Sequence, residues 1–429
     1  MFGESMEKGE YLQTPKGRFG RYEWRCDRRL YLDITDIEPR GKKTMSDGDQ
    51  LAFQKQVLQQ LTKRRRGAFR GPMVLRMSLS TTERTPSHIH TIAKNLLDLL
   101  ARPRPTIGTS RRGLLYFDDE QVHGLSLSCR HGQSKPRIFI TAMPLGFFLA
   151  DLDLAMNAQT ELRDEEETRL YNRDAIESFR DLLRDSNKER QYLSEKAFKA
   201  LIELQRCQAQ QHLLGSSRIS LANLGYLFGV GGVPLSKKDS LWNTLYKSWE
   251  SIIRKTPVRI LLPELPQEEG SSKAYKRLVE EQIRAFQRDF SWIIKPLRIP
   301  IGLEVVVKPP SPSERRGIHD LDNVLRDYII PRVVDVLQPV TDMAWTIDAE
   351  ALKNEDHKLY SFRRDRTKRL PASTRIGITR YEAWKLCRRQ RDKSPGFVSV
   401  AVTADMLPTD DILREIDQTI KRWEKIACR

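Results

Sequence analysis

The sequence predicts an α/β (α+β) protein with two small mixed-sheet domains of the same kind in one chain, joined by an α-helical insert. The first observation is a repeat: the order strand, helix, strand, polar site, helix, strand, strand occurs at residues 31–150 and again at 257–407. The second is that residues 151–256 are rich in Glu, Arg, Leu and Gln, with apolar residues at helical spacing. A basic N-terminal tail (1–30) and a C-terminal helix (408–429) complete the expected organisation.

The first copy opens with an alternating strand at residues 31–37, followed by a helix that begins near Asp49. Four cations end this helix, where they suit the negative end of its dipole and form a candidate DNA-binding patch: Lys63, Arg64, Arg65 and Arg66. The remaining expected elements are strands at 73–80, 125–129 and 137–141 and a helix at 86–100.

The second copy repeats these elements in the same order. We expect a strand at 258–263, a helix at 272–290, a strand after Pro300, and two last strands near 384–386 and 397–402. An insertion between Asp335 and Arg375 separates the polar site from the last two strands. It carries three arginines that indicate either a DNA-facing loop or a solvated surface run: Arg363, Arg364 and Arg366.

The polar site of the second copy contains two carboxylates, Asp320 and Asp322, directly before Asn323 and an apolar-periodic segment. Asp or Asn in front of such a segment marks the start of a helix. Mg²⁺ is usually held by one or two carboxylates together with substrate phosphates, so these two acids are candidate metal ligands. Arg315 and Arg316 precede them and are candidates for DNA contact. A helix cap with a solvated neighbour is the alternative.

Asp320-Leu-Asp-Asn323, followed by Arg326 on the next helical turn, resembles the core of RusA-type Holliday-junction resolvases. The resemblance covers both copies and implies a small α/β domain that works as a dimer and cuts branched or four-way DNA with Mg²⁺ (or Mn²⁺). The family has a Lys where this chain has Arg326. Arg keeps the positive charge but cannot be deprotonated, so the resemblance supports phosphate binding there and leaves a proton-transfer role in doubt.

The two copies carry complementary parts of the family's site. The first has Lys94, a candidate DNA-binding residue, at the family's lysine position and a second acidic pair, Asp118 and Asp119, but His88 and His90 replace its first pair. In the second copy, spacing assigns the missing acid to Asp348, whereas the strands that follow place the slot near Gly377–Thr379, which holds no acid.

Several interpretations follow for the chemistry. The second copy could be the active centre, with Asp320, Asp322, Asp348 and Arg326, while the first copy binds DNA. Alternatively, the two histidines with Asp118 or Asp119 could hold a transition metal, since imidazole suits such ions, or their site could be decayed. We expect the two sites to be separate, so that Asp119→Asn has little effect and only one strand is cut. A branched-DNA binder without catalysis, or an accessory subunit of a DNA-processing complex, remains the alternative function.

Composition favours a polyanionic partner, because 74 Lys and Arg outnumber 57 Asp and Glu and give a formal charge of +17. The five cysteines form no metal or disulfide pattern, which is typical of a reducing interior. No apolar run reaches membrane-spanning length. We therefore expect a cytoplasmic, nucleoid-associated protein that binds DNA, makes no membrane contact and forms a pseudo-dimer within one chain, which could act as a monomer.

Overall fold

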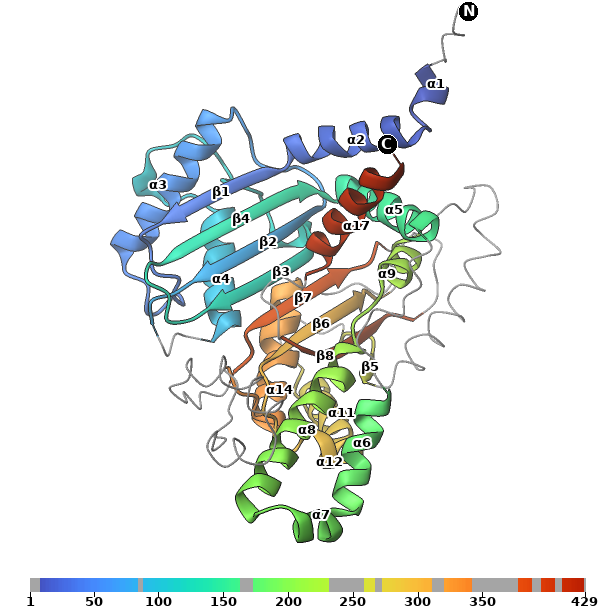
Figure 1. Cartoon of the computed structure of the whole chain (residues 1–429). Coiled ribbons are helices and arrows are strands. Elements are labelled where there is room, and N and C mark those ends of the chain that lie inside the picture. Colours follow the sequence, from blue (N-terminus) through green and yellow to red (C-terminus); the bar gives the residue numbers. More distant parts are fainter. Residues whose placement is uncertain are drawn as a thin grey trace, which may run out of the picture.

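The structure is a computed structural model, and it describes residues 8–83, 88–162, 173–230, 258–266, 272–310, 320–341, 377–387, 395–405 and 411–427. It confirms the predicted mixed α/β class. Eight strands are present in this part of the chain: β1 (Leu30–Thr35), β2 (Met73–Ser80), β3 (Val122–Arg130), β4 (Arg137–Pro144), β5 (Arg259–Pro263), β6 (Ile301–Lys308), β7 (Arg380–Lys385) and β8 (Phe397–Ala404). They form one continuous sheet in the order β1-β4-β2-β3-β7-β6-β8-β5 (Figure 1).

The strand order is the same in both halves of the sheet. Strands β2 and β3 are parallel, as are β6 and β7. Strand β4 pairs antiparallel with β2, and β8 pairs antiparallel with β6. The halves meet where β3 pairs antiparallel with β7, and Ser126 lies opposite Glu382 at this seam. Two equivalent strands paired antiparallel are what a two-fold relation between the halves produces. We call this relation the pseudo-two-fold.

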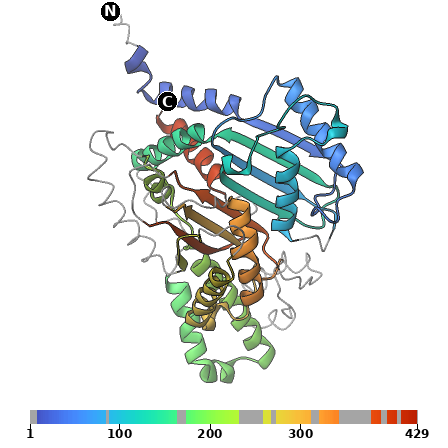
Figure 2. The same cartoon turned by 180° about the vertical axis from the view of Figure 1, so that it is seen from behind.

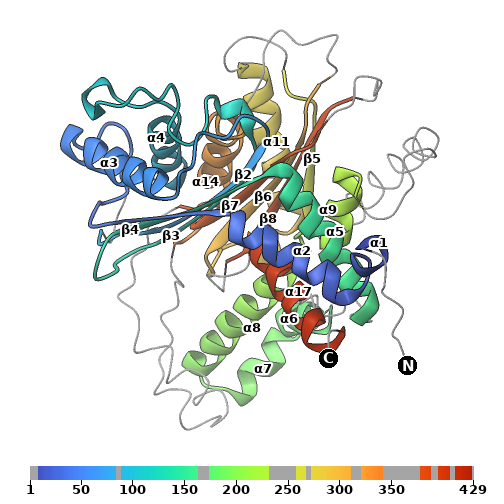
Figure 3. The same ribbon diagram turned by 90° about the horizontal axis from the view of Figure 1, so that it is seen from above.

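Helices from both halves cover one face of the sheet, as Figure 3 shows. They are α3 (Asp47–Lys63), α4 (Ile89–Ala101), α11 (Lys273–Asp289), α13 (Leu321–Val324), the π-helical turn η6 (Leu325–Ile329) and α14 (Ile330–Leu337). The Ser46 side chain caps α3 by accepting a hydrogen bond from the Asp49 N–H. Phe53, Val57 and Leu61 then follow at four-residue spacing and are fully buried against the sheet. The helix predicted from Asp49 onward is therefore present as α3, and its basic end lies where it was expected.

The opposite face is covered by α2 (Pro15–Arg28), α5 (Leu145–Leu162), α9 (Leu221–Phe228) and α17 (Ile412–Ala427) (Figures 2 and 3). The expectation of a basic tail at residues 1–30 is wrong for α2, which buries Tyr22. Arg25 of α2 and its C-cap residue Arg29 both pair with Asp151. Two of the basic residues in this segment thus hold α2 against α5. The predicted C-terminal helix is present as α17.

The described part of the insert is helical, as expected, and contains α6 (Arg173–Arg184), α7 (Ser186–Tyr192) and α8 (Glu195–Gly215) in addition to α9. It begins within a longer helix, because α5 runs across the boundary that we placed at residue 151. Gln210 of α8 donates hydrogen bonds to the carbonyls of Ile293 and Pro296, close to the short helix α12 (Ser291–Ile294). These contacts attach the insert to the second half of the sheet.

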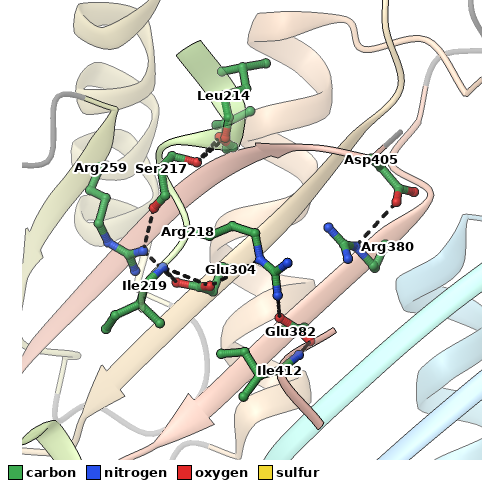
Figure 4. A network of polar contacts seen from close by, with 11 residues as sticks. Leu214, Ser217, Arg218, Ile219, Arg259, Glu304, Arg380, Glu382, Asp405 and Ile412 are labelled. Atoms are coloured by element: carbon green, nitrogen blue, oxygen red, sulfur yellow. Dashed lines mark hydrogen bonds and ion pairs between the residues drawn. The ribbon is translucent and has the colours of Figure 1, made fainter. Parts of the chain in front are cut away.

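A buried network of charges connects the insert with the sheet and with α17 (Figure 4). Glu304 of β6 lies 2.6 Å from the guanidinium of Arg259, and Glu382 of β7 lies 3.4 Å from that of Arg218. Glu382 also accepts a hydrogen bond from the Ile412 N–H, at the first residue of α17. Because every carboxylate here has a cationic or N–H partner, the network can lie under the helices without an isolated buried charge.

Candidate metal centre

Asp320 and Asp322 lie where the chain enters α13, on the face of the sheet that α4 and α14 also cover. Asp320 is the N-cap residue, with φ −71° and ψ 151°, and Asp322 lies in the first turn. The predicted helix start is therefore confirmed. The Asp320 side chain makes no capping hydrogen bond to the backbone, and Asn323 donates to its Oδ2 at 3.3 Å. The Asp320 carboxylate is thus held by a side chain and not used by the helix end.

Asp118 and Asp119 lie in the other half, in the turn that precedes β3. Asp118 caps the short 3₁₀ helix η2 (Asp119–Gln121), and Gln121 completes a capping box with the Asp118 backbone. The Gln121 side chain also donates to the carbonyls of Phe69 and Gly71, at 2.9 and 3.2 Å. These bonds fix the position of the turn that carries the acidic pair.

The two halves bring their acidic pairs together across the seam. Asp119, Asp320 and Asp322 each place one carboxylate oxygen within 4.8 Å of the others, and Asp118, Glu120 and Asp320 form a second such group. The expectation of separate sites is therefore wrong: Asp119 reaches the acids of the second copy. The cause is the β3–β7 pairing, which places the turn before β3 beside α13.

Lys94 of α4 connects the two acidic pairs. Its ammonium lies 2.9 Å from Asp119 Oδ2 and 3.0 Å from Asp322 Oδ2. Burial alone would lower the pKa of Lys94, but the carboxylates of Asp322 and Asp119 raise it above its ordinary value, so the side chain remains cationic. We expected Lys94 to contact DNA, and the structure places its ammonium inside the acidic group.

Burial and mutual repulsion make the carboxylates of this group difficult to ionise. Burial, followed by the negative charge of Asp322, raises the pKa of Asp320 to about 7, against the opposing charge of Lys385. The pKa of Asp322 is also raised by burial, while Lys94 opposes this shift. A cation placed among these oxygens would favour their charged forms.

Three buried oxygens of the group lack hydrogen-bond partners: Asp119 Oδ1, Asp320 Oδ1 and Asp322 Oδ2. The last of these is in ion-pair contact with Lys94 but outside hydrogen-bond geometry. The Asp322 side chain is only 5 % exposed, so water does not readily supply the missing partners. Oxygen-only donors at this spacing fit a hard divalent cation such as Mg²⁺ or Mn²⁺ better than a softer transition metal. The residues present therefore fit the Mg²⁺ or Mn²⁺ ion that the family resemblance implies.

Arg326 does not take the place that Lys94 occupies. It donates two hydrogen bonds of 2.8 Å to the carboxylate of its neighbour Asp327. Its charge affects the pKa values of Asp322 and His90, so it lies near the group without a direct bond to the acids. The π-helical turn η6 that carries it is a local widening of a kind often found at functional sites.

The histidines occupy the positions in the first half that the aspartates occupy in the second. His88 is the N-cap of α4, as Asp320 is the N-cap of α13, and the His88 and His90 rings stack with centroids 5.6 Å apart. Burial, followed by the charges of His88 and Arg326, lowers the pKa of His90 to about 4, so its ring is neutral at pH 7. Among the described side chains, neither histidine joins a group of three potential ligands, so the geometry does not bring them to Asp118 or Asp119 as a transition-metal site.

Other expected site residues lie elsewhere. The four cations from Lys63 to Arg66 are exposed at the end of α3. Six expected residues lie outside the described part of the chain: Arg315, Arg316, Asp348, Arg363, Arg364 and Arg366. Asp348 therefore has no described position relative to Asp320.

Sequence reasoning missed two residues of the site, Glu120 and Lys385. Glu120 belongs to the second acidic group, and it was passed over because it follows the family's pair and is not part of it. Lys385 ends β7, on the same face as Tyr381 and Ala383 by strand alternation, and its charge lowers the pKa of Asp320. Period-two alternation from Tyr381 would have placed Lys385 on this face of the sheet.

Comparison of the chain with protein-family models and with curated proteins finds no match. In the described residues, no helix combines the length and the apolar character needed to cross a bilayer.

Proposed function

We propose that the chain is a metal-dependent, structure-selective DNA endonuclease that acts on branched DNA such as four-way junctions, with Mg²⁺ as its cofactor and Mn²⁺ as a substitute. The observation that carries this proposal is the convergence of Asp119, Asp320 and Asp322 from both halves, with buried oxygens that lack hydrogen-bond partners. The formal charge of +17 fits a phosphate backbone as the partner. The sequence resemblance to RusA-type resolvases supports the same substrate.

In this proposal Asp119, Asp320 and Asp322 hold the metal, with Asp118 and Glu120 beside them. When bound, the metal lowers the pKa of a water molecule and stabilises the charge that develops on the phosphate. Lys94 holds Asp119 and Asp322 in place through its two ion pairs and can neutralise part of the negative charge of the phosphate. Asn323 fixes the orientation of Asp320 through its hydrogen bond.

We further propose that one chain makes one incision. A second site related by the pseudo-two-fold would need carboxylates at positions 88 and 90, and both positions hold histidine. The chain would therefore combine the shape of a symmetric dimer with a single acidic centre. Such a protein would recognise a symmetric junction and nick one of its strands.

The proposal is tested with a four-way junction and a linear duplex of the same sequence, incubated with the protein and Mg²⁺ or EDTA. We expect cleavage of the junction only, and only with Mg²⁺. Asp322→Asn should abolish it, because a buried ligand is lost without a change of shape. Asp33→Asn is the matched control, since Asp33 pairs with Arg137 at the edge strand β1, away from the acidic group. Equal cleavage by wild type and Asp322→Asn would contradict the proposal.

The position of Lys94 supports a second candidate function, a branched-DNA-binding protein or accessory subunit without nuclease activity. The ammonium already neutralises Asp119 and Asp322 and could replace a metal as the link between the halves. Titration of the protein with Mn²⁺ by calorimetry distinguishes the two functions. Junction binding without any Mn²⁺ binding would favour this second candidate.

A further inference from the structure

We infer that Phe117 is a stacking platform for an unpaired nucleobase beside the metal centre. This inference rests on the proposed function and adds a specificity-determining residue to it. Phe117 directly precedes Asp118 and Asp119, and its side chain is 44 % exposed. A large apolar ring next to a cluster of carboxylates has no role in binding a metal, so it requires another explanation.

Phe117 is held in a fixed position. Its backbone N–H donates to Gln121 Oε1 at 2.8 Å, and the Gln121 amide is itself fixed by the carbonyls of Phe69 and Gly71. The ring packs on the chain at Gly113, where an added Cβ would lie 3.1 Å from Phe117 Cδ1. The protein therefore supports part of the ring and leaves the rest open, which is the arrangement that a stacking platform needs.

The location of Phe117 distinguishes it from other exposed apolar side chains, which occur singly on most protein surfaces. The other large exposed hydrophobic residues of the described chain lie on helices α1, α2, α7, α9 and α17: Tyr11, Trp24, Tyr192, Tyr226 and Ile426. The ring of Trp24 is further covered by the guanidinium of Arg28, 3.9 Å from its centroid. In the described chain, only Phe117 among these residues adjoins the acidic group.

The chemistry of the ring selects the ligand. An aromatic face stacks on any nucleobase, and one such contact contributes about 1–3 kcal/mol by alanine substitution, which corresponds to a roughly 5- to 150-fold effect. Bases at a branch point cost less to flip out than bases inside a duplex, because the continuous stacking of the duplex is broken there. Phe117 would therefore favour branched over linear DNA and set the distance between the branch point and the incised phosphate.

The experiment places 2-aminopurine at the branch point of a four-way junction and uses an Asp320→Asn background, so that no cleavage occurs during the measurement. Stacking on Phe117 should change the fluorescence of the probe on binding. We expect this change to persist in Phe117→Tyr and to be lost in Phe117→Leu, which keeps apolar bulk but removes the π-face. Tyr192→Ala, which removes an exposed aromatic side chain from the insert, is the control and should behave like its parent.

Cleavage rates of the same variants with intact Asp320 provide the second measurement. We expect Phe117→Ala and Phe117→Leu to cut the junction roughly 5- to 150-fold more slowly, with Mn²⁺ affinity and thermal stability unchanged. The stacking role is overturned if Phe117→Leu gives the same fluorescence change as the Asp320→Asn background and the same cleavage rate as wild type. If wild type binds junctions without cutting them, the proposed nuclease activity is wrong, while the fluorescence measurement still tests Phe117. If wild type binds no junction, both the nuclease activity and the stacking role are wrong.

Discussion

At the residue scale, the central result is that the acids of the two copies form one group. Asp119 lies with Asp320 and Asp322, although about 200 residues separate them in the sequence. Spacing within one copy could not reveal this, because the neighbour of each acidic pair is set by the pairing of the halves. The composite group reverses our expectation for Asp119, since its carboxylate now belongs to the same candidate metal site as Asp320 and Asp322.

We predict that Asp119→Asn and Asp320→Asn both reduce junction cleavage by more than about 100-fold, because each would remove a charged carboxylate from the proposed metal site. Junction binding should persist in both variants, since neither removes a basic residue. Gel mobility shifts and cleavage assays on the same junction measure the two properties. Full activity in Asp119→Asn would show that the three carboxylates do not act on one metal.

Lys94 allows a second prediction at this scale. Lys94→Met should lower the free energy of unfolding by about 2 kcal/mol, less than for a fully buried pair, because a quarter of the Lys94 side chain is exposed. Without the ammonium, Asp119 and Asp322 repel each other, and a divalent cation should relieve this repulsion. Thermal unfolding with and without Mn²⁺ should therefore show a larger stabilisation by Mn²⁺ in the variant than in wild type. An equal shift in both proteins would contradict the link between Lys94 and the metal site.

At the element scale, the repeat in the sequence predicted most of the sheet. Pro72 and Pro300 precede β2 and β6, and Asp320 precedes α13 as expected. The seam between β3 and β7 was not predictable, because strand alternation shows which face a residue occupies but not which strand lies beside it. Helix α2 was missed for a different reason: its high content of Arg concealed one buried face around Tyr22.

The buried network on the opposite face gives a prediction about pH. Burial raises the pKa of Glu382 from 4.5 to about 7, against the opposing charges of Arg218 and Arg380. The folded state therefore binds a proton at Glu382 more tightly than the unfolded state does. The contribution of this residue to stability is largest below pH 4.5 and is lost as the pH rises towards 7.

We expect Glu382→Gln to remove this dependence. The difference in unfolding free energy between variant and wild type should change by on the order of 3 kcal/mol between pH 4.5 and 7, with wild type losing relative stability as the pH rises. Denaturant unfolding at several pH values measures it, and Asp33→Asn serves as an exposed-carboxylate control. A difference that is constant across this pH range, or that grows in the opposite direction, would show that the pKa of Glu382 is not raised in the folded protein.

At the scale of the whole molecule, the chain has a symmetric scaffold and an asymmetric site. The eight strands follow the pseudo-two-fold across the seam, and helices α4 and α13 begin at equivalent positions in the two halves. The residues at these positions differ, with His88 and His90 in one half and Asp320 and Asp322 in the other. A homodimer could not separate these roles, because symmetry would make both of its sites identical.

The asymmetry predicts how a junction is cut. A four-way junction with each strand labelled in turn should yield one incision per bound protein under single-turnover conditions with Mg²⁺ and excess protein. The product should remain a nicked junction, because cutting the opposite strand requires the protein to dissociate and bind again in the other orientation. A supercoiled plasmid with an extruded cruciform measures this directly, since one incision gives the nicked circle and two coupled incisions give the linear form. Linear product formed without passage through the nicked circle would require a second active centre, and it would contradict the single composite site.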